Sequence, residues 1–506
     1  MAKEKNQQYI IGIDIGTGST KAIAMDSKGT IIADSQLYYS TQNPKPGYAE
    51  QDPGIIWNAF KNCIGNIIDA VKYAPVSISF SSAMHGLIAV NEENKPISNL
   101  ITWADTRSEK IAEEIRKSKE AKSIYRATGT PIHPMIPLCK IIWLHKNQPA
   151  VFKNAFKFIS IKEFIWFRLF GVYEIDHSIA SATGLFNIKT LQWNKASMEF
   201  CGIKANQLSE PKPTNFIRKN ADSSILNSLS LSAETSFCIG ASDGCLANLG
   251  SYAMDKGTAA LTIGTSGAVR IASPKPVYNF EEMTFNYLLD DKTFICGGPV
   301  NNGGNVVQWL FEAFLNIEKP TEKDYENLFQ KIDSIPAGSK GLIFLPYLNG
   351  ERAPVWDGRA SGVFMGIKPF HTQAYFLRAA LEGICYSMNQ VLQIVESSTS
   401  KIEKLVVGGG FIHSKTWMKI LSDITGKKLL VIETQDSSAV GAALLNMKAM
   451  KMIKNYSSLK PNISQIVKPV FKKNSSYKKY FSVFKNLYEP IKELMHRNDE
   501  INKVLS

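Results

Sequence analysis

Apolar and small residues recur in two short runs near the start of the chain. The first run covers residues 10–15 and the second covers residues 22–25, with the segment GTGST at residues 16–20 between them. Runs of this kind are typical of β-strands, and a short glycine-rich connection predicts a hairpin turn. The chain is therefore expected to open with a β-hairpin, followed by a third strand near residues 30–38.

Further patterns predict alternating helices and strands in the first half. Asp52 suits the N-cap and Pro53 the first position of a helix, because the apolar residues that follow recur at helical spacing. The run VSISF predicts a buried strand that ends at SSAMHG, residues 81–86, and residues 87–99 predict a second hairpin. Two more helices are expected, at residues 109–122 and 162–170.

The second half of the chain repeats this scheme. The tripeptide Ile-Gly-Thr at residues 263–265 echoes the same tripeptide at residues 15–17, and a strand of small and apolar residues follows each. The later elements are three strands around this turn, a glycine loop that opens a helix at Val306, a strand at 341–348, a helix at 372–397 and a strand that runs into GGGF, residues 408–411. Repetition on this scale predicts two similarly built halves that face each other.

Composition agrees with a globular enzyme. At 506 residues, with 44% hydrophobic and 20% charged residues, the chain is expected to fold into about two to four compact units. No apolar run reaches the ~18 residues of a membrane helix, and residues 1–8 lack a secretory signal, so a cytoplasmic location is expected. The seven cysteines form no C-x-x-C motif, which predicts reduced thiols without a disulfide framework or zinc site.

The basic charge does not indicate a nucleic-acid partner. The formal net charge is +13, but lysine and arginine are spread along the chain and no nucleic-acid-binding signature accompanies them. The densest run, residues 468–479, is interpreted as a solvated face near the C-terminus. A basic surface could also concentrate anionic small molecules such as ATP and sugar acids.

The two glycine turns are candidates for phosphate binding. A Walker A loop or a dinucleotide fingerprint requires a helix after the glycines, whereas a strand follows here, so both of those readings fail. Backbone N–H groups of a glycine turn can still converge on an anion, with Thr and Ser hydroxyls as further donors. Asp14, at the end of the first strand, could hold a hydrated Mg²⁺. Each turn alone is equally compatible with a plain hairpin.

Two longer segments carry a family resemblance. Two phosphate-binding hairpins on opposite walls of a cleft resemble the actin, hexokinase and sugar-kinase superfamily. The segment MIPLCKIIWLHKN, residues 135–147, resembles the first signature of the FGGY carbohydrate kinases, and SGVFMGIKPFHTQAYFLRAALEG, residues 361–383, resembles the second. Tyr375 departs from the second signature, at a helix position interpreted as a surface variation.

This resemblance implies a fold and a division into domains. The implied fold class is α/β, with two ribonuclease-H-like domains of the actin/hexokinase superfamily, each a mixed five-stranded sheet flanked by helices, closing over a central cleft. Residues 1–250 are expected to bind the sugar and carry the first phosphate hairpin and the catalytic base. Residues 251–450 are expected to bind the nucleotide, and residues 451–506 to form a helical extension that packs on the body.

The resemblance also implies an activity. Phrases such as FSSAMHG, ITWADTRSE and LPYLNGERAP are most similar to those of bacterial gluconate kinases. They imply ATP-dependent phosphorylation of D-gluconate to 6-phospho-D-gluconate, with ATP and Mg²⁺ as cofactors. A kinase for xylulose or ribulose and a non-catalytic ATP-binding protein of the same fold are the alternatives. No nucleic-acid or membrane partner is expected, and a homodimer is one assembly that the sequence allows.

Asp243 is the candidate general base. It lies in GASDG, after an apolar strand, and the resemblance implies that this Asp accepts the proton of the sugar hydroxyl. The alternative is an Asp that satisfies the amides of a glycine turn. The expected substrate-binding residues are Met84, His85, Trp103, Arg107, His133, Met135 and Asp243, with Asp105 in the same wall. Arg107 or His133 is the candidate partner for a substrate carboxylate.

The nucleotide is expected to lie between the two turns and the triple glycine. Backbone without side chains lets a flat base and a phosphate chain approach closely. The residues expected to contact it are Gly16, Thr17, Gly18, Ser19, Lys21, Gly264, Thr265, Gly304, Gln308, Gly409, Gly410 and Ser414. A plain strand-to-helix turn is the alternative for the triple glycine.

Overall fold

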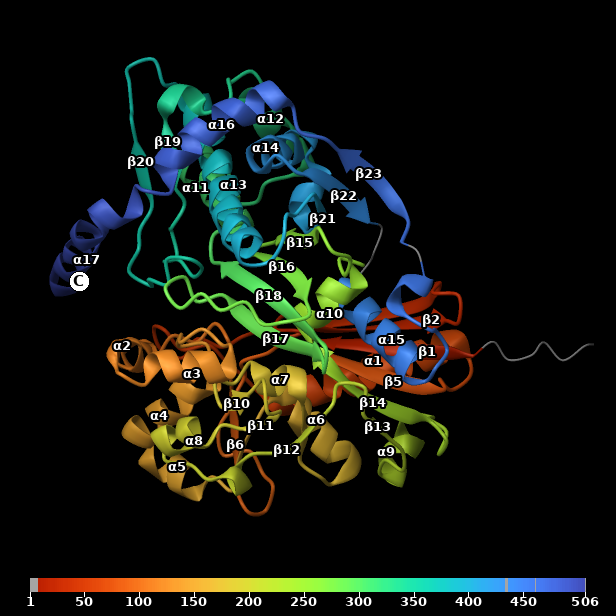
Figure 1. Cartoon of the computed structure of the whole chain (residues 1–506). Helices are drawn as coiled ribbons and strands as arrows, with labels where there is room; N and C mark the ends of the chain where they lie inside the picture. Colours follow the sequence, from red (N-terminus) through yellow and green to blue (C-terminus); the bar gives the residue numbers. More distant parts are fainter. Residues whose placement is uncertain (1–7, 433–435, 460, 506) are drawn as a thin grey trace, which may run out of the picture.

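The computed structural model describes residues 8–432, 436–459 and 461–505, which form two α/β lobes (Figure 1). The sheet of the first lobe has six strands in the order β13-β14-β5-β1-β2-β3. Their bounds are β1 Tyr9–Ile15, β2 Ser19–Asp26, β3 Ile31–Tyr38, β5 Ser77–Ser82, β13 Ile217–Arg218 and β14 Ser236–Ser242. The predicted opening hairpin is confirmed, because β1 and β2 pair antiparallel from Tyr9 opposite Asp26 to Ile15 opposite Thr20.

The helix α1, Pro53–Val71, shows why the local pattern folds as predicted. The Asp52 side chain accepts a hydrogen bond from the backbone N–H of Gly54, as an N-cap does. Residues at helical spacing, including Ile56, Phe60 and Ile64, are buried against the sheet. Burying this apolar stripe anchors the helix on the outer face of the first sheet.

The second lobe is built around a seven-stranded sheet in the order β17-β18-β16-β15-β21-β22-β23. Its strands are β15 Thr258–Ile263, β16 Gly267–Ser273, β17 Phe285–Asp290, β18 Thr293–Val300, β21 Lys404–Gly408, β22 Lys428–Ile432 and β23 Ile463–Val467. The expectation of five strands per sheet is therefore too low. Five strands form the mixed core of each sheet, and the edges are extended by β13 in the first lobe and by β17 and β23 in the second.

Helices cover the second sheet and the region between the lobes (Figure 1). The main ones are α11 Gly304–Leu315, α12 Glu322–Asp333, α13 Gln373–Ser398, α14 Lys415–Thr425, α16 Phe471–Phe484 and α17 Tyr488–Leu505. The C-terminal segment is not helical throughout, because β23 pairs antiparallel with β22 before α16 begins. The first lobe carries a smaller helical region with α2 Glu109–Lys117, α3 Ala121–Thr128, α4 Pro137–Asn147, α6 Ile161–Phe170 and α7 His177–Ser181.

Two helices join the lobes. They are α10, Asp243–Gly250, and α15, Ser437–Ala449, and α15 packs on β1 and β5 although it follows β22 of the second sheet in the sequence. The two helices approach so closely that a Cβ on Gly250 would overlap the carbonyl oxygen of Ser437, and one on Gly441 would overlap that of Leu246. Glycine is required at both positions because the backbones themselves are in contact.

Three local predictions are wrong in detail. Residues 87–99 do turn back on themselves, with an antiparallel bridge between Val90 and Pro96, but the longer pairing of β6, Ile88–Val90, is with the distant strand β8, Lys157–Ile159. The helix expected at 109–122 ends at Lys117, where the Ser118 hydroxyl and N–H both bond to the carbonyl of Ile115 and compete with the next turn. The strand expected at 341–348 is reduced to β19, Ile343–Leu345, which pairs only with β20, Val363–Met365.

Two further observations concern the cysteines and the helices. All seven cysteines are buried and free. Among the described helices, none combines the length and the apolar character needed to cross a membrane.

Candidate active site

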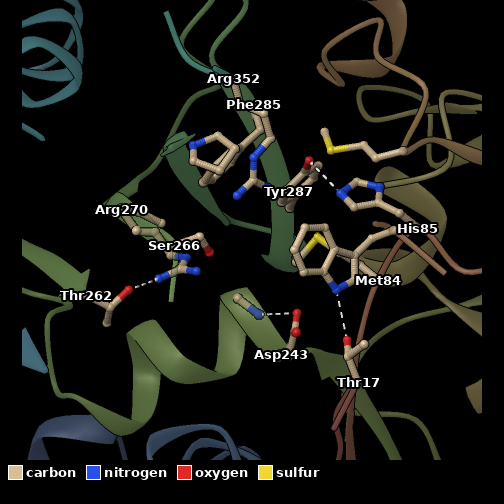
Figure 2. A pocket seen from close by; sticks show the side chains of 16 residues that line it. Thr17, Met84, His85, Asp243, Thr262, Ser266, Arg270, Phe285, Tyr287 and Arg352 are labelled. Atoms are coloured by element: carbon tan, nitrogen blue, oxygen red, sulfur yellow. Dashed lines mark hydrogen bonds between the residues drawn. The ribbon is translucent and has the colours of Figure 1, made fainter. Parts of the chain in front are cut away.

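A cavity of about 300 Å³ lies where the two lobes meet. Its lining includes Met84, His85, Trp103, Met135 and Asp243, which were predicted to bind substrate, and Thr17 from the first turn. Figure 2 shows the labelled members of this group converging with residues that were not predicted, which are Arg270, Phe285 and Tyr287 of the second sheet and Arg352 of the loop between β19 and β20. The cavity is at the small end of the range for ligand pockets, which suits a small-molecule acceptor.

Asp243 occupies the junction between β14 and α10. The strand ends at Ser242 and Asp243 is the first residue of the helix, so the predicted glycine turn is in fact a strand-to-helix junction. One carboxylate oxygen accepts a hydrogen bond of 2.6 Å from the N–H of Gly244. Burial raises the pKa of Asp243, and the positive charge of Arg270 opposes this rise. No ion pair within the described residues neutralises the carboxylate, which leaves it free to accept a proton.

His85 lies in the cavity as a neutral hydrogen-bonding group. Its Nδ1 lies 2.7 Å from the carbonyl oxygen of Ala182, so this nitrogen carries the proton and Nε2 accepts from the Tyr287 hydroxyl at 3.2 Å. Burial lowers the pKa of His85 to about 3. The backbone of His85 is held in place by Lys140, which donates a hydrogen bond of 2.6 Å to the carbonyl oxygen of His85.

Trp103 connects the cavity to the first glycine turn. Its indole Nε1 donates a hydrogen bond of 2.8 Å to the hydroxyl of Thr17. On its other side the Arg352 guanidinium lies 5.2 Å from the ring centroid, within range of a cation–π interaction. The indole is therefore held in place by groups from both lobes.

Arg107 does not line the cavity. Its guanidinium forms ion pairs with Asp105 at 2.7 Å and Glu50 at 2.5 Å, and its side chain is only 2% exposed. The same group packs over the ring of Tyr48 at 3.7 Å. Both carboxylate partners belong to the protein, so the structure gives no support to Arg107 as the partner of a substrate carboxylate.

His133 is no better suited to that role. Its ring packs edge to face with Trp356 at 5.4 Å, and its Nδ1 accepts a hydrogen bond from the N–H of Met135. Burial, and then the charge of Arg352, lower the pKa of His133 well below its usual value. A neutral imidazole cannot supply a cation.

The structure provides two other arginines, which sequence reasoning missed. Arg270 extends from β16 and donates to the Thr262 hydroxyl at 3.2 Å, while Arg352 donates to the carbonyl of Val300 at 3.0 Å. Neither forms an ion pair with a carboxylate of the described chain. Arg270 and Ala268 share one face of β16, because residues two apart on a strand point to the same side, and both line the cavity.

A second cavity, of about 620 Å³, adjoins the second phosphate turn. It brings together five residues predicted to contact nucleotide: Gly264, Thr265, Gly304, Gly410 and Ser414. Aromatic side chains form another part of its wall: Tyr325, Phe329, Phe411 and Trp417. Glycine backbone beside aromatic surface can receive a flat base.

Two of the predicted nucleotide contacts are placed differently. Gln308 is partly exposed on α11 and its side chain donates to Glu312 and to the carbonyl of Glu318, away from the cavity lining. Gly409 does not line the cavity but supports the turn, since it has φ +98° and packs against the backbone of Ile263.

The second turn separates the two cavities. Residues 263–265 face the larger cavity, while Thr262 and residues 266–268 face the smaller one that holds Asp243. The backbone of Gly264 is held in place by Gly304, whose N–H donates a hydrogen bond of 2.6 Å to the carbonyl oxygen of Gly264. A phosphate chain lying across this turn would have one end in each cavity.

The first turn, residues 16–18, lies beside a group of charged side chains. Lys21 forms an ion pair of 3.0 Å with Asp436, and Asp14 accepts a hydrogen bond of 2.6 Å from Ser81. Burial, with the negative charges of Asp436 and Asp243, raises the pKa of Asp14. Ser19 instead accepts a hydrogen bond from Gln36. A cation at Asp14 would relieve the repulsion among these carboxylates.

Two family models match the chain. The N-terminal domain of the FGGY family of carbohydrate kinases matches residues 9–250, and the C-terminal domain of the same family matches residues 259–450. The gluconokinase of Bacillus subtilis (strain 168) is 38% identical over 488 residues, which are 95% of this chain and 95% of that protein.

Solved structures agree with this result. The gluconate kinase from Lactobacillus acidophilus has a TM-score of 0.91 and 33% identity, covering 96% of this chain and 98% of that one. A ligand-bound xylulose kinase from the same organism has the same TM-score, identity and coverage. With both domain models matched, and a relative 38% identical along 95% of its length, this chain belongs to the FGGY family of carbohydrate kinases.

Proposed function

We propose that the protein transfers the γ-phosphoryl group of ATP to O6 of D-gluconate and forms 6-phospho-D-gluconate. The observation that carries this proposal is the position of Asp243, in a small cavity that also contains two arginines without carboxylate partners. A carboxylate base suits a hydroxyl acceptor, and an excess of positive charge suits an acidic sugar. The similarity to gluconokinases supports the same acceptor.

In this mechanism Asp243 accepts the proton of the attacking hydroxyl. A sugar hydroxyl is a weak nucleophile, so a positioned base facilitates its attack. The γ-phosphoryl group reaches the hydroxyl across the second turn, where backbone N–H groups and the hydroxyls of Thr265 and Ser266 can stabilise its charge. Closure of the two lobes would exclude water and so limit hydrolysis of ATP.

The residues around the first turn fit a hydrated Mg²⁺ that arrives with the nucleotide. No group of three or more potential ligands is preassembled among the described residues. Mg²⁺ usually keeps several waters and binds through one or two carboxylates together with substrate phosphates. Asp14 is the carboxylate that we assign to it, and the ion would neutralise phosphate charge.

Turnover should depend on pH through Asp243. The base must be ionised to accept a proton, and burial raises the pKa of Asp243 above its usual range. We therefore expect kcat/KM for gluconate to fall as the pH is lowered. The midpoint of this fall should lie above about 4, the ordinary pKa of an aspartate. A pH profile of kcat/KM measures this directly. An acid limb at or below that value would contradict the assignment.

A panel of acceptors tests the proposed substrate. ADP release is measured for D-gluconate and other sugar acids, and for the ketoses xylulose and ribulose, at saturating ATP. We expect the largest kcat/KM with gluconate. Negligible turnover of gluconate beside rapid turnover of xylulose would instead identify a ketose kinase, and no turnover of any acceptor would favour a non-catalytic ATP-binding protein.

A further inference from the structure

The cavity has more positive charge than the protein itself balances. Arg270 and Arg352 both line it, and Figure 2 shows their guanidinium groups turned toward its interior. Burial is the main cause that lowers the pKa of Arg352 to about 10. The nearby positive charge of Arg270 acts in the same direction. Two neighbouring cations that remain charged at neutral pH, partly removed from water, repel each other unless an anion lies between them.

The available hydrogen bonds do not satisfy these groups. Arg352 is 9% exposed, and its Nε has no hydrogen-bond partner in the described structure. The carboxylate of its neighbour Glu351 accepts from the backbone N–H groups of Asn301 and Arg352 and from the Asn302 side chain, and forms no ion pair with the Arg352 guanidinium among the described residues. Burial raises the pKa of Glu351 to about 7, so it is a weak counter-charge near neutral pH.

The carboxylate of Asp243 is not a substitute partner. It influences Arg270 electrostatically, but no ion pair joins the two side chains, and within the described part of the chain the Arg270 side chain donates to the neutral hydroxyl of Thr262. Arg270 lies beside the start of α10, because its Nε would be 3.4 Å from a Cβ on Gly244, whereas the Arg352 guanidinium lies 5.2 Å from the ring centroid of Trp103. The arginines thus extend from the base toward the far side of the cavity.

The other cationic candidates near the cavity are already engaged or neutral. Arg107 is bound to Asp105 and Glu50, and Lys140 donates to three backbone carbonyls. His85 and His133 are neutral because burial lowers the pKa of each. Among the described residues, the two arginines are therefore the positive groups that a ligand in this cavity would meet.

We propose that Arg270 and Arg352 together bind the carboxylate of the sugar acid and so select acidic over neutral acceptors. This assignment rests on the proposed gluconate kinase activity and replaces Arg107 and His133 as the carboxylate site. A planar guanidinium donates paired hydrogen bonds to a carboxylate, and a neutral ketose would leave both arginines buried and uncompensated. Binding the acid group at this end leaves the terminal hydroxyl free to reach Asp243.

Binding and turnover of the Arg270→Met and Arg352→Met variants test this assignment. Methionine keeps much of the length of the side chain and removes its charge. We expect the KM for gluconate to rise at least ~100-fold in each variant, because a charged partner of the carboxylate is lost. By contrast, kcat and the KM for ATP should each change less than about fivefold. Calorimetry in an Asp243→Asn background should show the same loss in Kd for gluconate and an unchanged Kd for ATP.

Two controls separate charge recognition from folding. Arg359→Met removes an arginine near Arg352 that pairs with Glu500 outside the cavity, and it should leave the KM for gluconate unchanged. The Arg270→Lys and Arg352→Lys variants retain the charge and should recover part of the lost affinity. Equal thermal midpoints of the Met and Lys variants would show that the fold is intact.

The outcomes distinguish this assignment from the activity on which it rests. If the wild-type protein phosphorylates ketoses and not gluconate, the proposed function fails, whatever the arginines do. If the wild-type protein uses gluconate but the Met variants bind it within about threefold of wild type, the assignment is overturned. A fall in kcat with an unchanged Kd for gluconate would also overturn it, because the arginines would then act on phosphoryl transfer.

Discussion

The Asp243→Asn variant is expected to lose turnover by a factor of about 10² to 10⁴, the usual contribution of a general base. Asparagine keeps the shape of the side chain and its acceptor oxygen for the N–H of Gly244, but it cannot take the proton of the attacking hydroxyl. The loss should therefore appear in kcat. The measurement is the initial rate of ADP release at saturating gluconate and ATP.

Binding provides the control for this variant. Calorimetric affinities for ATP and gluconate should stay within about fivefold of wild type, since Asp243 is assigned to the chemical step. Asp69→Asn, an isosteric change at an exposed position on α1, should have wild-type kinetics. If Asp243→Asn turned over at the wild-type rate, the base would have to be another group and the proposed chemistry would be wrong.

The Gly409→Ala variant is expected to have the second-largest effect, on both stability and ATP use. Gly409 has φ +98° and ψ 173°, a conformation that is essentially restricted to glycine. An added Cβ would overlap the carbonyl oxygen of Ile263 and lie 2.7 Å from its carbon. We expect a loss of about 3 kcal/mol in unfolding free energy, or roughly 6–12 °C in Tm for a domain of this size, and a higher KM for ATP as the second turn shifts.

The neighbouring glycine offers a matched control. A Cβ on Gly410 would meet no heavy atom within 4 Å, and its backbone lies outside the left-handed region. Gly410→Ala should therefore unfold within about 2 °C of wild type, as expected for a surface change that costs ~0.5 kcal/mol or less. Equal thermal midpoints for the two variants would refute the close contact between Gly409 and the second turn.

Much of the fold could be predicted because the signals are local. The opening hairpin and α1 follow from alternation, a glycine turn and an N-cap, which depend on neighbours in the sequence. The pairing of β6 with β8 could not be predicted in this way, because the partners are separated by the segment 91–156 and only tertiary packing brings them together. The edge strand β23 was missed for the same reason, because about 30 residues separate it from its partner β22.

The candidate site shows the same limit. Met84, His85, Trp103 and Met135 lie together with Asp243, as the family resemblance implied. Arg107 was an appropriate residue type for a carboxylate, but its protein partner Glu50 lies 57 positions earlier in the chain, and nothing in the local sequence indicates that contact. Arg270 was overlooked because no motif draws attention to a lone arginine on a strand. Its significance depends on the absence of an acidic partner, which only the three-dimensional structure shows.

The central claim is that this cavity selects and phosphorylates a sugar acid. A competition experiment tests it most directly. The protein is mixed with Mg²⁺, equal concentrations of D-gluconate and D-xylulose, and a limiting amount of ATP. The products are then identified by phosphorus and carbon NMR. Because both acceptors compete for one enzyme, the product ratio equals the ratio of their kcat/KM values. The account predicts 6-phospho-D-gluconate as the dominant product. Xylulose phosphate as the dominant product would contradict it.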